Sequence, residues 1–316
     1  MDPKLADVQE LKLHPVSARK PISKSQSKLE NKSTNLKLPF NPISRLSLIE
    51  DKIIQGDKRI YGNLAKFSSQ GKNVIVEYVG CPFLCAYCWN VNRNEKINLI
   101  GGTFFTPNEV ATKVSLIPHV NEIETFTFSG AEPILGANSC RHLLQVIDLI
   151  HIHQPKVQFI IETNGLALGL DLDLSKEIAK REEIIVRVSI KGTTPEQFEA
   201  ITGAQKSVFE LPIKAIVNLT QVGVETSIVI VRDVFKTPEL IDELKTTVKT
   251  AGCSNDILTT TEVLDRLKSS FVMDGEEEKF VPHEETNHLP DILIDIEDLR
   301  YLPGVQNRMK ERKIKL

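Results

Sequence analysis

The 316-residue sequence lacks a long apolar run, an excess of charge of one sign and an even set of cysteines. No stretch approaches the roughly 18 apolar residues that a membrane-spanning helix requires. The first residues are polar and basic, without the apolar core of a secretory signal. The formal net charge of −3 gives no general reason to expect nucleic-acid binding. We therefore expect a cytoplasmic protein whose partners are neither membranes nor nucleic acids.

The five cysteines cannot all pair, and thiols inside a cell stay reduced. Three of them, Cys81, Cys85 and Cys88, have the spacing C-x3-C-x2-C. Three thiolates in one short loop can converge on a single metal site. A structural zinc site normally has four ligands, and the sequence shows no convincing fourth. A [4Fe–4S] cluster held by three cysteines would leave one iron open to a small ligand.

The composition divides the chain into three parts. Residues 1–45 are rich in Ser, Lys and scattered Pro, and we expect a mostly disordered basic extension. Residues 46–251 are expected to form the folded core. Residues 252–316 are expected to begin as an irregular loop and to end in a strand at 292–296 and a helix at 305–313. We expect the basic residues at the end of that helix to be solvated. They are Lys310, Arg312, Lys313 and Lys315.

The core alternates between strand-like and helical patterns. Runs rich in β-branched and aromatic residues predict buried parallel strands. These strands are expected at 73–79, 123–128, 157–161, 184–190 and 224–231. Helical patterns are found at 107–116, 139–153, 174–181, 195–201 and 237–250. This alternation predicts an α/β fold with a parallel sheet, and the run at 292–296 would be its sixth strand.

Polar and small residues follow four of the predicted strands. Cys81 comes after the first, Ser129-Gly130-Ala131-Glu132 after the second and Glu162-Thr163-Asn164-Gly165 after the third, while Ser189 and Lys191 close the fourth. Because parallel strands present their carboxyl ends on one face, these residues are expected to line a single pocket.

Residues 79–90, VGCPFLCAYCWN, resemble the cluster-binding loop of radical S-adenosylmethionine (radical SAM) enzymes. The string is most similar to the glycyl-radical activating branch, which includes the pyruvate formate-lyase activating enzymes. That branch commonly has His where this chain has Trp89. The resemblance covers about residues 71–232, and it implies a partial (β/α)6 TIM-like barrel.

Three later motifs resemble the same superfamily. Gly130-Ala131-Glu132-Pro133 is similar to the GGEP motif, with Ala for the second Gly, and Glu162-Thr163-Asn164-Gly165 is similar to the [D/E]TNG element. Ser189-Ile190-Lys191 resembles an Asp-Leu-Lys segment of the activating branch, with Ser replacing Asp. A monovalent cation that some activating enzymes hold at the two acidic positions, here Glu162 and Ser189, is therefore in doubt.

The resemblance implies a role for each of these residues. Cys81, Cys85 and Cys88 would bind three irons of a [4Fe–4S] cluster, and S-adenosylmethionine (SAM) would chelate the fourth. Tyr87 would lie near the adenine. The backbone of Gly130-Ala131 and the carboxylate of Glu132, which precedes Pro133, would receive the methionyl ammonium. Lys191 would face the methionyl carboxylate, and Glu162 with Ser189 would lie near that carboxylate or the ribose.

The implied activity is that of an oxidoreductase that cleaves SAM reductively to a 5′-deoxyadenosyl radical, using electrons from a donor such as ferredoxin or flavodoxin. The substrate remains open. The chain could be an activase that places a glycyl radical on a partner protein, or it could act on a small molecule or nucleobase precursor, as a 7-carboxy-7-deazaguanine synthase does. A non-catalytic zinc module is a third, remote alternative.

Overall fold

The computed structural model describes residues 36–67, 72–88, 94, 102–117, 119–230 and 303–314. The expected extension up to residue 35, the helix at 237–250 and the strand at 292–296 lie outside these residues. Part of the segment assigned to the extension is folded, since Phe40 is buried and helix α2 (Pro42–Ile53) starts soon after it. The division into three parts otherwise stays a prediction.

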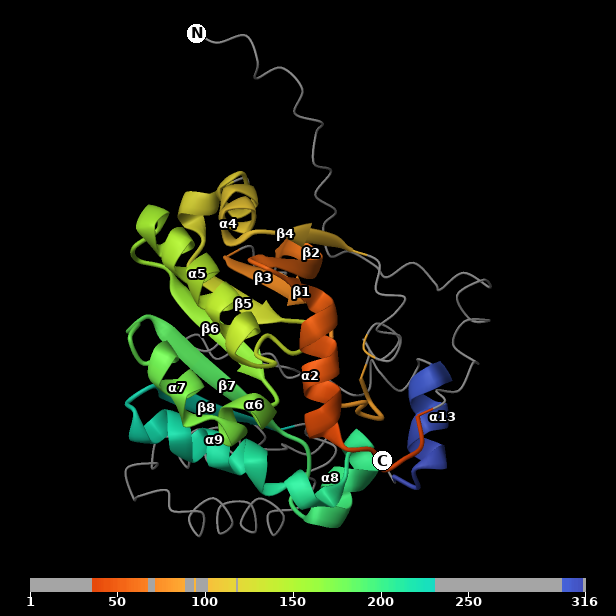
Figure 1. Cartoon of the computed structure of the whole chain (residues 1–316). Coiled ribbons are helices and arrows are strands. Elements are labelled where there is room, and N and C mark those ends of the chain that lie inside the picture. The colour runs from red at the N-terminus through yellow and green to blue at the C-terminus, as the bar shows by residue number, and fades with distance from the viewer. Residues whose placement is uncertain are drawn as a thin grey trace, which may run out of the picture.

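The described residues form an α/β fold around one mostly parallel sheet (Figure 1). Five strands run parallel in chain order, as the sequence predicted. They are β3 (Asn73–Tyr78), β5 (Thr125–Ser129), β6 (Gln158–Thr163), β7 (Ile184–Ile190) and β8 (Glu225–Ile230). This arrangement is consistent with a partial TIM-like barrel.

An antiparallel extension that the sequence analysis missed continues the sheet beyond β3. Strand β2 (Lys58–Phe67) pairs antiparallel with β3, with β1 (Ile54–Gln55) and with β4 (Thr103–Phe105). The register between β2 and β3 shifts twice, between Tyr61 and Asn63 and between Asn63 and Lys66. This irregular strand adds buried residues, including Arg59 and Tyr61, beside the first parallel strand.

Helices alternate with the parallel strands along the chain (Figure 1). They are α4 (Pro107–Ser115), α5 (Ala137–His153), α6 (Leu166–Leu170), α7 (Leu172–Ile178), α8 (Pro195–Thr202) and α9 (Glu210–Gln221), and α13 (Pro303–Glu311) follows near the end of the chain. The helices expected at 107–116, 139–153, 174–181, 195–201 and 305–313 are thus present with shifted ends, whereas α2, α6 and α9 were not predicted.

Local sequence explains where several helices begin. Thr106 caps α4 by accepting a hydrogen bond from the backbone N–H of Glu109, whose carboxylate bonds back to Thr106. Asn41 caps α2 in a similar way, and proline occupies the first position of both helices. Proline suits this position because the first turn leaves its N–H groups without intrahelical partners.

One face of the sheet is apolar, and the other, called the polar face below, carries polar side chains together with apolar ones such as Ile160. Phe126, Phe128 and Phe159 are fully buried, and the Phe159 ring stacks with both of the others. The alternate residues of β5 are polar, and the Thr127 hydroxyl donates to Asn73 Oδ1 over 3.0 Å. Because side chains alternate across a strand, the polar face is free to line a site.

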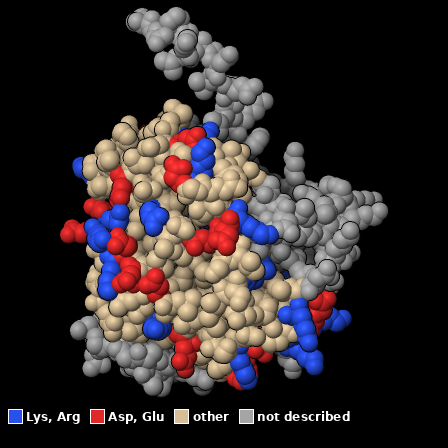
Figure 2. Space-filling model, in the orientation of Figure 1, with Lys and Arg blue, Asp and Glu red and all other residues tan. Residues whose placement is uncertain are grey.

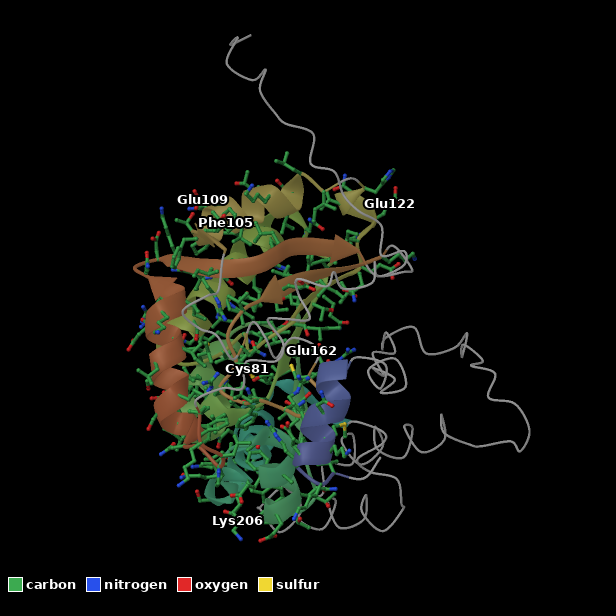
Figure 3. All side chains as sticks on the ribbon, turned by 90° about the vertical axis from the view of Figure 1, so that its right-hand side faces the viewer. Cys81, Phe105, Glu109, Glu122, Glu162 and Lys206 are labelled. Atoms are coloured by element: carbon green, nitrogen blue, oxygen red, sulfur yellow. The ribbon has the colours of Figure 1, made fainter. Side chains whose placement is uncertain are left out.

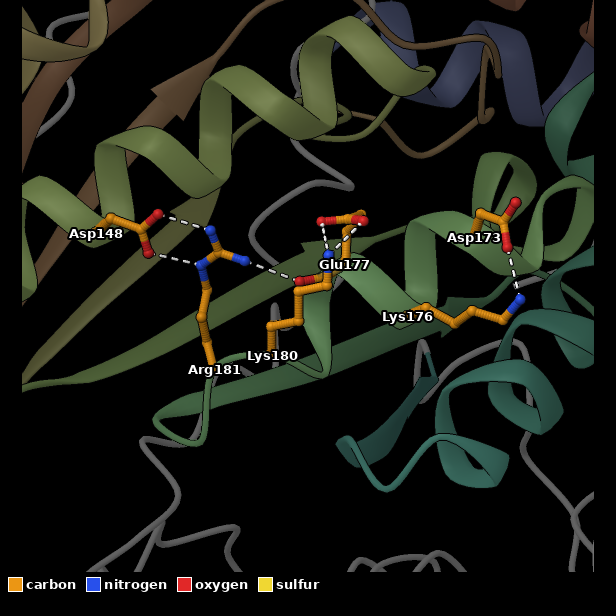
Figure 4. Close-up of polar contacts among 6 residues, drawn as sticks. All are labelled: Asp148, Asp173, Lys176, Glu177, Lys180 and Arg181. Atoms are coloured by element: carbon orange, nitrogen blue, oxygen red, sulfur yellow. Dashed lines mark hydrogen bonds and ion pairs between the residues drawn. The ribbon is translucent and has the colours of Figure 1, made fainter.

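Charged side chains of both signs intersperse over most of the face shown in Figure 2. Several make ion pairs along α7 (Figure 4), and the Arg181 guanidinium holds Asp148 of α5 with two contacts of 2.6 Å. This paired geometry ties the segment that follows α7 to α5. Among the described residues, we find no helix of the length and apolarity needed to cross a membrane.

Candidate cofactor site at the strand ends

The cysteine loop follows β3 and is held by backbone hydrogen bonds. Gly80 has φ +86° and lies so close to α2 that a Cβ at this position would be 2.6 Å from the Ile49 side chain. Only glycine fits this approach. Farther along the loop, the N–H of Leu84 donates to Thr202 O and that of Ala86 to Ile201 O, over 3.0 and 2.8 Å. The loop is therefore fixed to the end of α8.

The three loop thiols lie close enough together to influence one another. Burial raises the pKa of Cys81 well above its usual value, and Glu132, Cys85 and Cys88 raise it further. Burial also raises the pKa of Cys85, although the positive charges of Lys191, Arg312 and Arg308 oppose this rise. Burial thus favours the protonated thiol at Cys81 and Cys85, and iron bound at this loop would displace these protons.

Two amide groups point at the sulfurs of this loop. Asn164 Nδ2 lies 3.7 Å from Cys81 Sγ and Asn94 Nδ2 lies 3.8 Å from Cys88 Sγ, each donating a hydrogen bond. Donors to cysteine sulfur stabilise a thiolate ligand and tune the potential of an iron–sulfur centre. The donor set therefore fits a cluster held by these cysteines.

Glu132 links the loops that follow β3, β5 and β6. Its carboxylate accepts hydrogen bonds from Thr163 Oγ1 (2.6 Å) and from the backbone N–H groups of Asn164 (2.7 Å) and Ile134 (3.1 Å), while its own N–H donates to Gly80 O (3.0 Å). Burial raises its pKa to about 7, against the effect of these donors. Three of the four segments expected to line one pocket are thus joined by hydrogen bonds of Glu132.

Tyr87 of the cysteine loop carries a buried polar atom. Its hydroxyl is buried and has no hydrogen-bond partner among the described residues. The Lys191 ammonium lies 5.8 Å from the centre of the Tyr87 ring, at the carboxyl end of β7. A buried unpaired hydroxyl costs free energy, so this one marks a place where a ligand can supply the partner.

Glu162 lies between neighbouring strands of the polar face. It accepts a hydrogen bond of 2.5 Å from Ser129 Oγ, and Arg187 Nη1 lies 3.5 Å from its other oxygen. Figure 3 shows Cys81 and Glu162 at the middle height of the molecule, toward the upper end of α13. Glu162 is in register with Arg187 of β7, and Ser189 lies two residues farther along that strand, in register with Val229 of β8. The expected place of Glu162 and Ser189 near the methionyl carboxylate or the ribose stays a prediction.

The backbone of Gly130 lies against β3. Its φ is +88°, and a Cβ would lie 3.2 Å from the Glu77 side chain. Ala131 is half-buried, and Pro133 is buried at the start of the segment leading to α5. The left-handed conformation therefore favours glycine at the first position of this motif.

Comparison with known proteins identifies the family. The model of the radical SAM superfamily matches residues 75–250, which is more than half of the chain. The chain belongs to the radical SAM superfamily. This membership implies a [4Fe–4S] cluster and SAM as cofactors, and the cysteine loop described above supplies a donor set that fits them.

Other similarities to this radical SAM protein are partial. An uncharacterized protein of Methanothermobacter thermautotrophicus is 32% identical over 121 residues, which cover 38% of this chain and 42% of the relative. The chain thus matches less than half the length of that curated relative. Among solved structures, anSMEcpe with bound AdoMet and a Cp18Cys peptide is 20% identical, with 54% and 45% of the two chains covered and a TM-score of 0.40. Streptococcus suis SuiB bound to its precursor peptide SuiA is 17% identical, with 56% of this chain and 36% of that chain covered and a TM-score of 0.42.

The family membership favours the cluster over the zinc module. Within the described ranges, no group of three or more His, Cys, Asp or Glu side chains is arranged to hold a metal ion on its own. A four-iron cluster is wider than a single ion, so its three thiolates do not need to meet around one point.

Two arginines contact the site loops and were missed by the sequence analysis. Arg59 of β2 is fully buried and donates to Pro133 O (2.5 Å) and Glu132 O (2.9 Å). Arg308 of α13 donates from Nε to Ala86 O and from Nη2 to Cys88 O, both over 3.1 Å. Both lie outside residues 75–250, and no motif of the sequence singles them out.

Proposed function

We propose that this radical SAM protein is an activating enzyme that abstracts hydrogen from a glycine of a partner protein. The observation that carries an enzymatic role is the joining of the cysteine loop to Glu132, whose N–H donates to Gly80 O. Lys191 lies 5.8 Å from the ring of Tyr87, whose buried hydroxyl has no partner among the described residues. The activase assignment is supported by the string at residues 79–90. As part of the same proposal, the enzyme works in the cytoplasm with ferredoxin or flavodoxin as electron donor.

When bound, the cluster and SAM would supply reductive cleavage of the sulfonium C–S bond to methionine and a 5′-deoxyadenosyl radical. The protein's task is to bind and orient them. Cys81, Cys85 and Cys88 would hold iron, and Lys191 would pair with the methionyl carboxylate. A carboxylate has about four lone-pair sites, and since Glu132 uses three for protein donors, one is left for the methionyl ammonium.

The cluster assignment is tested by anaerobic reconstitution. We expect about four irons and four sulfides per chain, with SAM altering the EPR signal of the reduced cluster, because three thiolates leave one iron open. Cys85→Ala should abolish SAM cleavage. Cys140→Ala is the matched control, because Cys140 is a buried cysteine of α5 outside the loop. Wild-type cleavage by Cys85→Ala would overturn the assignment.

A second candidate function is supported by Glu162-Thr163-Asn164-Gly165, because deazaguanine-forming synthases carry a similar element. In this case the substrate is a small molecule or nucleobase precursor. Anaerobic incubation of the reduced enzyme and SAM with an extract of the source organism separates the two. A persistent organic-radical EPR doublet that co-migrates with a macromolecule supports the activase. A new low-mass product formed in proportion to 5′-deoxyadenosine, without a protein radical, supports the second candidate.

A further inference from the structure

The C-terminal helix α13 reaches the cysteine loop from more than 200 positions away in the sequence. Met309 is 3% exposed and packs with the core, which anchors the helix. On the preceding residue, the Arg308 guanidinium bonds the carbonyls of Ala86 and Cys88, on either side of Tyr87. Figures 1 and 3 show α13 on one side of the sheet, near the end of α8.

A second arginine of the same segment contacts the support of that loop. Arg312 Nη1 donates to Ile201 O over 2.8 Å, and the same carbonyl accepts from the N–H of Ala86. The expectation that Arg312 is a solvated helix terminus is therefore wrong, whereas Lys310 and Lys313 are exposed as expected and Lys315 lies outside the described residues. The loop is thus held from α8 and from α13 at once.

A guanidinium suits this position for two reasons. Its planar fork presents several N–H donors in fixed directions, so one side chain can set the spacing of two carbonyls. Its charge is permanent, and it lies at the backbone of Cys88. Reduction of a bound cluster by one electron from an external low-potential donor adds one negative charge at this loop, and a nearby positive charge stabilises that charge.

We propose that Arg308 is a positioning residue for the cluster: it fixes the loop through the Ala86 and Cys88 carbonyls and favours the reduced state by its charge. This inference rests on the proposed radical SAM activity. Lys191 and Arg312 are further cationic groups near the loop, and Glu132 is an anionic one. Arg308 differs from them because it bonds the backbone of a cysteine ligand directly.

The test compares Arg308→Gln, Arg308→Lys and Lys310→Gln in the full-length reconstituted chain. Lys310→Gln removes the same charge from an exposed position of the same helix. The measurements are an EPR-monitored reductive titration, the rate of iron loss to a chelator, and amide hydrogen exchange of residues 81–88. For Arg308→Gln we expect the reduction potential of the cluster to fall. At a fixed solution potential, the ratio of reduced to oxidised cluster should drop by up to about tenfold, which corresponds to about 59 mV for one electron.

Arg308→Gln should also lose iron several-fold faster than wild type. Arg308→Lys should keep the potential near wild type, because the charge remains, but it should raise hydrogen exchange in the loop, since an ammonium lacks the fork. If the potential, iron retention and exchange of Arg308→Gln all match those of Lys310→Gln, the inference is wrong. If Arg308→Gln does not fold, hydrogen exchange of Arg308→Lys provides the test: faster exchange in the loop than in wild type supports the inference, and equal exchange contradicts it. A wild-type chain that assembles no cluster would instead overturn the proposed function.

Discussion

Arg59 and Arg308 apply the same chemistry to two different loops of the site. Each donates to two successive or nearly successive backbone carbonyls, one pair at Glu132 and Pro133 and the other at Ala86 and Cys88. Arg59 comes from the antiparallel extension and Arg308 from the C-terminal helix. The segments before and after residues 75–250, which match the family model, thus each supply one arginine that binds the backbone of a site loop.

Arg59→Met should destabilise the fold and weaken SAM binding. The substitution leaves two buried carbonyls unpaired, at about 1–3 kcal/mol for each, and removes the contact of the guanidinium with the Tyr78 ring, 4.0 Å away. We expect the free energy of unfolding, measured with urea, to fall by about 2–6 kcal/mol, and the affinity for SAM, measured by calorimetry, to fall as well. Arg141→Met, at an exposed arginine of α5, is the control. Equal stability of the two variants would contradict this role.

Glu132 should make the stability of the metal-free chain depend on pH. Its pKa is raised from 4.5 to about 7 by burial, so the folded state binds this proton more tightly than the unfolded state. The resulting stability is fully present below about pH 4.5 and is lost as the pH rises through 7, up to about 3 kcal/mol. Urea unfolding at several pH values between 5 and 8 should show this loss in wild type and a flatter profile in Glu132→Gln. Parallel profiles would show that Glu132 does not titrate in this range.

At the scale of elements, the short helix α6 depends on close packing against α9. Gly169 faces the Leu211 backbone so closely that a Cβ there would lie 2.0 Å from the Leu211 oxygen. Asn218 of α9 also donates to Leu168 O over 2.7 Å. Because α6 follows Glu162-Thr163-Asn164-Gly165 directly, this packing holds the end of β6 and its site residues in place.

Gly169→Ala should therefore separate α6 from α9 and destabilise the protein by about 2–3 kcal/mol, because an extra methyl in a packed contact forces the backbone to move. Gly223→Ala is a suitable comparison. Its Cβ would meet nothing within 4 Å, although its φ of +81° carries a strain of about 1 kcal/mol. Urea unfolding midpoints measure both, and a smaller effect at Gly169 than at Gly223 would contradict the packing argument.

At the scale of the whole molecule, three distant segments meet at the end of α8. The cysteine loop binds Ile201 O and Thr202 O, Arg312 binds Ile201 O, and Phe40 pairs with Gly203 and Ala204. The Phe40 side chain is 6% exposed and belongs to the core. The end of α8 is thus the point through which both ends of the described chain support the site.

Phe40→Ala should destabilise the protein by about 3–5 kcal/mol, because a large buried side chain leaves a cavity. It should also increase iron loss from the reconstituted protein, since α8 supports the cysteine loop. Leu38→Ala, with 41% of Leu38 exposed, should cost much less. Urea unfolding and chelator-driven iron release are the two measurements. If the variant is less stable but releases iron at the wild-type rate, then Phe40 does not help to hold the cysteine loop.

The parallel strands and the motifs at their ends could be predicted from local patterns, because a buried parallel strand is apolar along its length and its loop follows directly. The contacts of Arg59 and Arg308 with the site loops, and that of Glu162 with Arg187, are visible only in the folded chain. These contacts join residues of different elements, and their partners are mostly backbone carbonyls, which every residue carries. Because a backbone carbonyl is present at every position, no residue type in the sequence indicates which carbonyls an arginine will bind. Such an arginine can be recognised only in the folded structure.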